Sequence, residues 1–148
     1  MTISIRVGKK TDAEAAIAIL RQSITQLCSA DHHDDDAEIA IWLSNKTAGS
    51  WAAWINRDDA TVLVAELAGN IVGVGMVDAQ GEILLNYAHP DARFKGISKA
   101  ILLALEAQAR ARGIKMCVLE STQTAKMFYE ARGYQAAAGS PLYLSKRL

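Results

Sequence analysis

The sequence predicts an α/β (α+β) fold, in which a mixed, mostly antiparallel sheet of about six or seven strands is flanked by helices. Two observations predict this fold class. Apolar segments with a period of two recur between short turns, which is typical of an antiparallel meander. The range 82–119 then contains a strand-like segment, an amphipathic helix and a second apolar strand, which predicts a central parallel βαβ crossover. We expect residues 1–148 to form a single domain, because no repeat, linker or low-complexity segment divides them.

The N-terminal half contains both strand-like and helix-like periodicities. Alternating apolar side chains at 3–7 predict a half-buried strand, and Thr11 with Glu14 has the spacing of a capping box for the next helix. Farther along, 68–70 has the composition of a tight hairpin turn. The expected elements are a strand at 3–7, helices from Thr11, over 37–45 and from Thr47, and strands at 61–67 and 71–77.

Glycines and tryptophans indicate how this half packs. Gly73 and Gly75 alternate with apolar residues, so they leave one face of a strand nearly bare for close packing against a helix. The three tryptophans, Trp42, Trp51 and Trp54, are expected to be core anchors.

The segment 31–36 is the most polar on the chain and contains two histidines and four aspartates. Imidazole and carboxylate groups both bind metal ions, so a metal site is one interpretation. Adjacent residues rarely converge on one ion, and we therefore favour a solvated loop whose last aspartates cap the next helix. The acidic character also suggests a cationic binding partner.

A basic loop leads directly into the central amphipathic helix. Arg93 and Lys95 precede Gly96, and the apolar stripe of the helix begins at Ile97. The first backbone N–H groups of a helix lack internal partners, and the helix dipole is positive there. This loop is therefore suited to a phosphate or pyrophosphate group.

The segment that follows the central helix, 114–119, is almost continuously apolar and predicts a strand that is buried on both faces.

Two motifs in the second half resemble those of the GNAT superfamily of acyl-CoA-dependent N-acetyltransferases. The first, at the start of the central helix, is matched by Arg93, Gly96 and, with a serine in place of Gly or Ala, Ser98. Thr122 stands where the second motif has an asparagine. The other residues that match the second motif are Ala125, Phe128, Tyr129, Gly133 and Tyr134.

The resemblance implies a GNAT-like fold and transfer of an acetyl group from acetyl-CoA, as cosubstrate, to a primary amine. The acceptor would be a small molecule or a peptide, and the amine would attack directly in a ternary complex. A non-catalytic acyl-CoA-binding module is the alternative. The implied coenzyme-binding residues are Tyr87, Ala88, Arg93, Phe94, Lys95, Gly96, Ser98 and Lys99.

Candidate catalytic residues follow from what acyl transfer to an amine requires, and for Tyr129 also from the resemblance. Tyr129 is the candidate general acid, because a phenol is protonated at neutral pH and can give its proton to a leaving thiolate. It could instead only pack in the core. Glu120, at the exit end of its strand, is the candidate general base. Other candidates for activating the amine are Glu82, His32, His33 and Asn86, the last by orienting a water molecule.

Composition excludes several other classes of protein. Sixteen basic and sixteen acidic residues cancel, which argues against general binding to nucleic acid or to an anionic membrane. Cys28 and Cys117 are expected to be buried, reduced thiols, with no disulfide or zinc site. No apolar stretch approaches the roughly 20 residues of a membrane span, and we expect a cytoplasmic protein. Sheet edges could support a homodimer.

Overall fold

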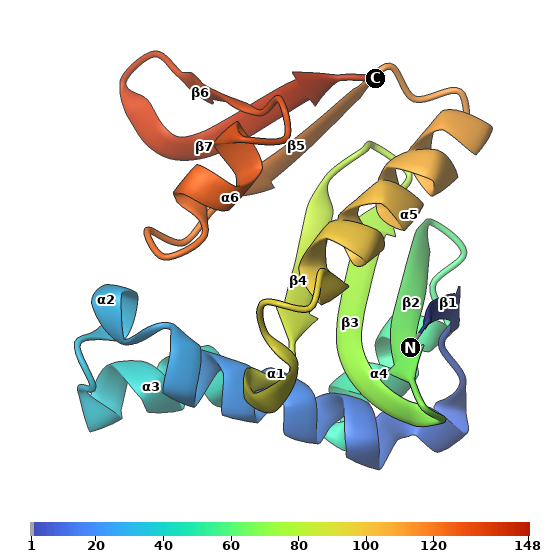
Figure 1. Ribbon diagram of the computed structural model, residues 1–148, viewed down its shortest axis with the longest axis vertical. Coiled ribbons are helices and arrows are strands. Elements are labelled where there is room, and N and C mark those ends of the chain that lie inside the picture. The colour runs from blue at the N-terminus through green and yellow to red at the C-terminus, as the bar shows by residue number, and fades with distance from the viewer. Residues whose placement is uncertain (1) are drawn as a thin grey trace.

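The computed structural model describes residues 2–148, whose strands form two antiparallel sheets with helices around them (Figure 1). The first sheet, in spatial order, consists of β1 (Ile3–Val7), β2 (Ala60–Leu67), β3 (Asn70–Asp78) and β4 (Ile83–Ala88). The second, in spatial order, consists of β5 (Met116–Glu120), β7 (Ser140–Arg147) and β6 (Gln135–Ala137). The predicted fold class is confirmed.

The expected central crossover is reduced to one point of contact between the sheets. Glu82 forms a parallel bridge with Val118, and the Val118 N–H donates to the Gly81 carbonyl at 3.0 Å. Beyond it, within residues 2–148, β4 pairs only with β3, and β5 pairs only with β7. The expectation of one continuous sheet is therefore wrong, because the two central strands diverge and leave a wedge between them (Figure 1).

A bulge in β4 contributes to this divergence. Val77 pairs with Ile83 and Met76 pairs with Leu85, so Leu84 is an extra residue on β4. A bulge bends its strand and increases the local twist. The bend follows directly after the bridge at Glu82 and turns the rest of β4 away from β5.

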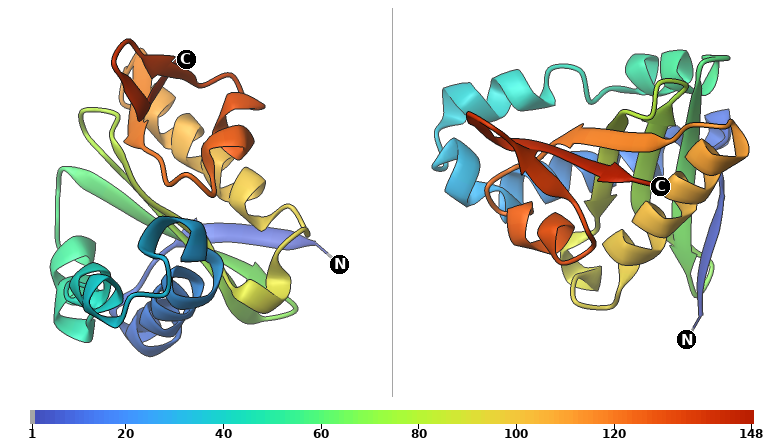
Figure 2. Two further views of the ribbon diagram at one scale, coloured as in Figure 1. Left: turned by 90° about the vertical axis from the view of Figure 1, so that its left-hand side faces the viewer. Right: turned by 90° about the horizontal axis from the view of Figure 1, so that it is seen from above.

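The helices cover both faces of the first sheet (Figure 2). One face packs against α1 (Ala13–Leu27) and α4 (Ala48–Ile55), and the other against α5 (Ile97–Ala111). The shorter helices are α2 (Ser29–His32), α3 (Asp36–Leu43) and α6 (Lys126–Glu130), with 3-10 turns at Lys10–Asp12 and Pro90–Ala92. No helix among residues 2–148 combines the length and the apolar character needed to cross a bilayer.

The bare face of β3 is filled by α5, as the glycine pattern predicts. A Cβ atom at Gly73 would lie 2.7 Å from both Ile97 Cγ2 and Ile101 Cδ1, and one at Gly75 would overlap Ile101 Cγ2. These glycines therefore set how closely α5 approaches the sheet.

Several local expectations need correction. Thr11 and Glu14 form no capping box. Instead the Asp12 carboxylate accepts the Lys9 N–H at 2.8 Å and two bonds from Arg6, whose guanidinium holds the pKa of Asp12 below its usual range. Strand β5 was expected to be buried on both faces, but it is buried on one face only. Met116, on the other face, is 43% exposed.

The polar segment 31–36 is more ordered than a solvated loop. Its first part forms α2, and His32 is fully buried. Its last part behaves as expected, since Asp35 accepts the Ala37 N–H at 3.4 Å and caps α3. Trp51 is fully buried, whereas Trp42 is half-buried. Both cysteines are buried, as expected, and both are free thiols.

Candidate active site

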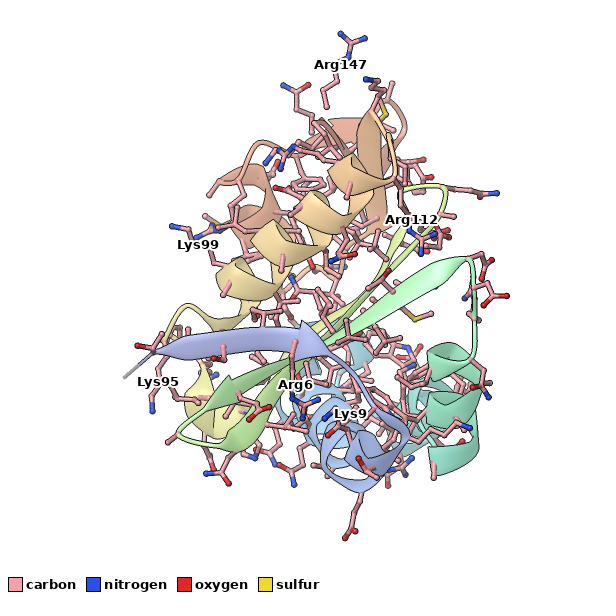
Figure 3. The ribbon with its side chains drawn as sticks, turned by 90° about the vertical axis from the view of Figure 1, so that its right-hand side faces the viewer. Arg6, Lys9, Lys95, Lys99, Arg112 and Arg147 are labelled. Carbon is pink, nitrogen blue, oxygen red and sulfur yellow. The ribbon has the colours of Figure 1, made fainter. Side chains whose placement is uncertain are left out.

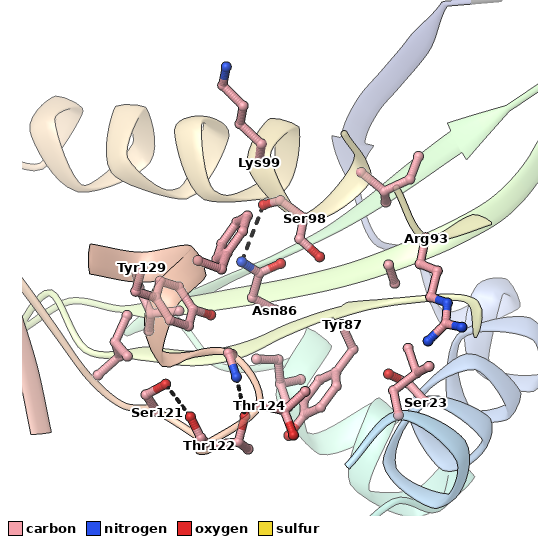
Figure 4. Close-up of a pocket in the computed structure, with 18 of the residues that line it drawn as sticks. Ser23, Asn86, Tyr87, Arg93, Ser98, Lys99, Ser121, Thr122, Thr124 and Tyr129 are labelled. Carbon is pink, nitrogen blue, oxygen red and sulfur yellow. Dashed lines mark hydrogen bonds between the residues drawn. The ribbon is translucent and has the colours of Figure 1, made fainter. Parts of the chain in front are cut away.

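A cavity of about 510 Å³ lies in the wedge between β4 and β5 (Figure 4). This volume is in the usual range for small-molecule sites. The walls come from α1, the second half of β4, the loop before α5, the first turn of α5, the end of β5, and α6. The bulge and the divergence of the two strands therefore create the site.

The N-terminus of α5 forms one wall. Gly96, its N-cap, has a φ of 80°, and a Cβ atom there would meet nothing within 4 Å. Glycine is thus favoured by its backbone conformation, and the space in front of the helix is open. The N–H groups of Ile97, Ser98 and Lys99 precede the first intrahelical bond, so they are free to bind an anion, with support from the helix dipole.

Cationic side chains surround this N-terminus unequally. Arg93 lines the cavity, points toward Ser23 of α1 in Figure 4, and has its guanidinium carbon 5.0 Å from the ring centre of Phe94. Phe94 also lines the cavity and is 93% exposed. Lys99 lines it too and projects from the first turn of α5 (Figure 3), whereas the exposed Lys95 lies outside the lining.

Past the bridge, β4 presents an edge that is free of strand pairing within residues 2–148. Tyr87 and Ala88 line the cavity along this stretch. Asn86 donates from Nδ2 to the Ser98 carbonyl at 3.3 Å, which joins β4 to the start of α5. Its Oδ1 atom is buried and has no hydrogen-bond partner in the described structure. The wall therefore contains a buried acceptor whose hydrogen-bonding capacity is unused.

Tyr129 of α6 is buried in an aromatic cluster that lines the cavity. It is 7% exposed, and its ring packs edge-on against Phe128 and Tyr134, with ring centres 5.1 Å and 5.6 Å away. Burial raises the pKa of Tyr129 to about 12, although the neighbouring Asn86 side chain opposes the rise. The hydroxyl group is therefore protonated at neutral pH, as a proton donor requires.

The candidate bases lie in different environments. Glu120, the last residue of β5, is exposed and lines both this cavity and a second one of about 710 Å³. Glu82 lines the second cavity. His32 is fully buried with both ring nitrogens bonded to backbone atoms, and His33 lies outside both linings. The geometry thus retains the two glutamates and argues against the two histidines as bases.

The same bonds argue against a metal site at 31–36. His32 uses its ring nitrogens within α2 and its surroundings, and Asp31 binds Gln123 and Thr124. Within residues 2–148, no group of three or more His, Cys, Asp or Glu side chains is arranged to hold a metal ion.

Most of the residues expected to act at the site share one cavity. The expected residues in its wall are Tyr87, Ala88, Arg93, Phe94, Gly96, Ser98, Lys99, Glu120 and Tyr129. The α1 residues in the wall could not be predicted, because only the fold brings them there; they are Ser23, Leu27 and Cys28. Arg132 was also not predicted as a site residue, yet it lines the cavity, and its buried Nε lacks a partner in the described structure.

Similar structures share this architecture over the whole chain. The PaiA N-acetyltransferase of Thermoplasma acidophilum, in complex with coenzyme A, has a TM-score of 0.89 and 24% identity, covering 100% of each chain. A GCN5-related N-acetyltransferase of Rhodopseudomonas palustris has a TM-score of 0.88 and 26% identity, covering 100% of this chain and 97% of that one. The ribosomal-protein-S18-alanine N-acetyltransferase of Escherichia coli has a TM-score of 0.71 and 16% identity, covering 99% and 94%.

A model of the acetyltransferase (GNAT) domain matches residues 28–144, which include both motifs and every strand of the wedge. Membership favours an enzyme over a non-catalytic binding module. The chain therefore belongs to the GNAT acetyltransferase family and is an acyltransferase.

Proposed function

We propose that this chain is a single-domain N-acetyltransferase that transfers an acetyl group from acetyl-CoA to a primary amine of a small molecule or peptide by direct attack in a ternary complex. One observation carries the proposal: a single cavity contains the free N–H groups at the start of α5 and the buried, protonated Tyr129. Acyl transfer from a phosphate-bearing thioester needs both an anion site and a proton donor.

The wall fits coenzyme A in two ways. The N–H groups after Gly96 and the side chains of Arg93 and Lys99 suit its phosphates. The unpaired edge of β4 at Tyr87 and Ala88 suits its extended amide arm. A neighbour of similar fold was solved with coenzyme A. Phe94 and Ser98 complete the proposed contacts, and Lys95 adds charge from outside the wall.

Acid and base roles follow from the surroundings of the side chains. Tyr129 gives a proton to the departing thiolate, because its hydroxyl remains protonated at neutral pH. An alkyl ammonium with a pKa near 10.4 is neutral in only about one molecule in a thousand at pH 7, so a base is needed. Glu120 is the proposed base, because it lies in the wall of both cavities.

Coenzyme binding is tested first by the thermal midpoint with acetyl-CoA, free coenzyme A and a dinucleotide. At about a hundred times the dissociation constant, binding adds about 2.7 kcal/mol, or roughly 5 to 10 °C. Gly96→Glu should abolish the shift by placing a carboxylate beside the phosphates. Gly139→Glu is the matched control, since Gly139 also has a positive φ (76°) and an open Cβ position, but lies outside the cavity lining.

Transfer is then tested by amine-dependent release of the coenzyme thiol and by mass spectrometry of the product amine. We expect release to depend on both acetyl-CoA and a primary amine. A protein with a coenzyme shift but no transfer to any primary amine in a broad panel would contradict the proposed activity.

A further inference from the structure

The carboxylate of Asp31 joins α2 to the loop that precedes α6. Its Oδ1 accepts the Gln123 N–H at 2.6 Å, and its Oδ2 accepts the Thr124 hydroxyl at 2.8 Å and the Thr124 N–H at 3.4 Å. These partners are 92 and 93 residues away along the chain. We call this contact the Asp31 clasp. It connects the helical layer of the first sheet to the segment between the second sheet and α6.

The position of Asp31 is fixed by its neighbour. His32 is fully buried, its Nε2 lies 2.8 Å from the Ile24 carbonyl, and its Nδ1 accepts the Asp34 N–H at 3.0 Å. Nε2 therefore donates to the carbonyl, and Nδ1 acts as the acceptor. The ring also packs edge-on against Trp42, with centres 5.7 Å apart. These contacts hold α2 in place.

Backbone strain supports the same conclusion. His33 and Asp34 follow directly and both have positive φ values, 55° and 54°. The left-handed backbone conformation costs free energy for residues other than glycine, and two such residues in a row keep it only where surrounding contacts stabilise it. The turn that ends α2 therefore depends on the contacts around it.

The clasp lies where the two cavities meet. Thr124 lines the cavity of about 510 Å³, and Asp31 and Gln123 line the one of about 710 Å³. Both cavities share the segments of β4 and β5 on either side of the wedge. The shared residues are Ile83, Leu84, Tyr87, Glu120, Ser121 and Thr122. An acceptor in the second cavity therefore reaches the shared segments beside the Asp31 bonds.

The wall of the second cavity suits a small amine. Asp31, Glu82 and Glu120 bring three carboxylates to it, and Lys46 is the lone cationic side chain among its lining residues. This excess of negative charge attracts an ammonium ion. The volume is also that of a small-molecule site.

On the basis of the proposed acetyl transfer, we propose that the Asp31 clasp restricts the acceptor to slender small-molecule amines and disfavours lysine side chains within a polypeptide. The acceptor enters through the second cavity and meets Glu120 in the wall that the two cavities share, beside the clasp. A polypeptide would need an open groove between α2 and the loop before α6, and the clasp ties these two segments together. Asp31 is thus a specificity-determining residue that acts by holding these two segments together.

The test compares kcat/KM for n-hexylamine with that for a short peptide containing one internal lysine and a blocked N-terminus. Wild-type protein should prefer hexylamine by about tenfold or more. Asp31→Ala should raise the relative kcat/KM of the peptide about tenfold, while the thermal shift with coenzyme A is unchanged. Asp36→Ala, an exposed aspartate in the same segment, should behave as wild type.

Two further variants separate specificity from loss of folding. Thr124→Val removes one bond of the clasp and leaves the backbone bonds, so it should change the substrate ratio in the same direction but less. Asp31→Asn keeps an acceptor oxygen and should fall between wild type and Asp31→Ala. Hydrogen exchange at Gln123 and Thr124 should be slow in wild type and faster in Asp31→Ala.

The outcomes that overturn the clasp differ from those that overturn the activity. Equal use of peptide and hexylamine by wild type, or an unchanged ratio in folded Asp31→Ala and Thr124→Val, would overturn the clasp while acetyl transfer stands. Absence of transfer to every amine, with the coenzyme shift intact, would overturn the proposed function itself.

Discussion

At the scale of single residues, Tyr129 combines a buried ring with a hydroxyl group that its surroundings keep protonated. Tyr129→Phe removes the hydroxyl and retains the packing against Phe128 and Tyr134. We expect kcat to fall about a hundredfold or more, because a positioned proton donor contributes at least that much. The thermal shift with coenzyme A should not change.

Steady-state kinetics measure the effect on kcat. The control is Tyr143→Phe, which removes the hydroxyl group of an exposed tyrosine. Wild-type turnover in folded Tyr129→Phe would remove this residue from the mechanism.

Burial of Tyr129 also makes stability depend on pH in the alkaline range. Its pKa is about 12 in the folded protein and near 10 in an unfolded chain, so the folded state holds this proton more tightly. The resulting stabilisation is complete below about pH 10 and is lost as the pH rises toward 12. Denaturant titrations across this range should therefore show a steeper loss of unfolding free energy for wild type than for Tyr129→Phe. Parallel curves for the two proteins would contradict the assigned burial.

Individual site residues were predictable only where a local pattern contains them. Gly96 precedes a helical stripe, and Tyr129 lies at a fixed spacing from Gly133, so both belong to short motifs. Asp31 is different, because its partners are 92 and 93 residues away and nothing in the adjacent sequence specifies them. The same holds for His32. Its position among aspartates suggests an exposed side chain, but its ring is buried against Trp42 and α1.

At the scale of elements, the contact between β3 and α5 sets the position of the coenzyme wall. A Cβ atom at Gly75 would overlap Ile101 and lie 3.1 Å from Leu105 Cδ1, so Gly75→Ala should push α5 away from the sheet. We expect a loss of about 1–3 kcal/mol in unfolding free energy and weaker coenzyme binding, because α5 carries the free N–H groups. Denaturant unfolding and titration calorimetry measure the two effects. Alanine at the loosely surrounded Gly49 is the control.

Element types were more predictable than the arrangement of strands. The strands, the hairpin at Ala68 and Gly69, and the long helices follow from periodicity and turn residues, which act over a few positions. The divergence of β4 from β5 depends on the bulge at Leu84 and on a bridge between Glu82 and Val118. Both are pairing events between distant strands, and an apolar pattern does not fix their register.

At the scale of the whole molecule, an ion pair between a buried carboxylate and a half-buried lysine ties the two sheets together through α5. Glu106 of α5 is 1% exposed and accepts bonds from the Tyr134 hydroxyl at 2.8 Å and from Lys146 Nζ of β7 at 3.1 Å. Because α5 also packs on the first sheet, this pair helps to fix the angle of the wedge that contains the cavity.

Lys146→Met should therefore affect both stability and binding. Removal of the ammonium leaves the buried Glu106 carboxylate with Tyr134 as its remaining partner in the described structure, which should cost about 3 kcal/mol of unfolding free energy. A looser wedge should also reduce the thermal shift with coenzyme A. Lys115→Met, at an exposed lysine before β5, is the matched control.

Adding Glu106→Gln to Lys146→Met removes the unpaired charge and keeps an acceptor for Tyr134, so the double variant should recover much of the lost unfolding free energy. A double variant as unstable as Lys146→Met alone would show that lost packing, and not the unpaired carboxylate, causes the effect.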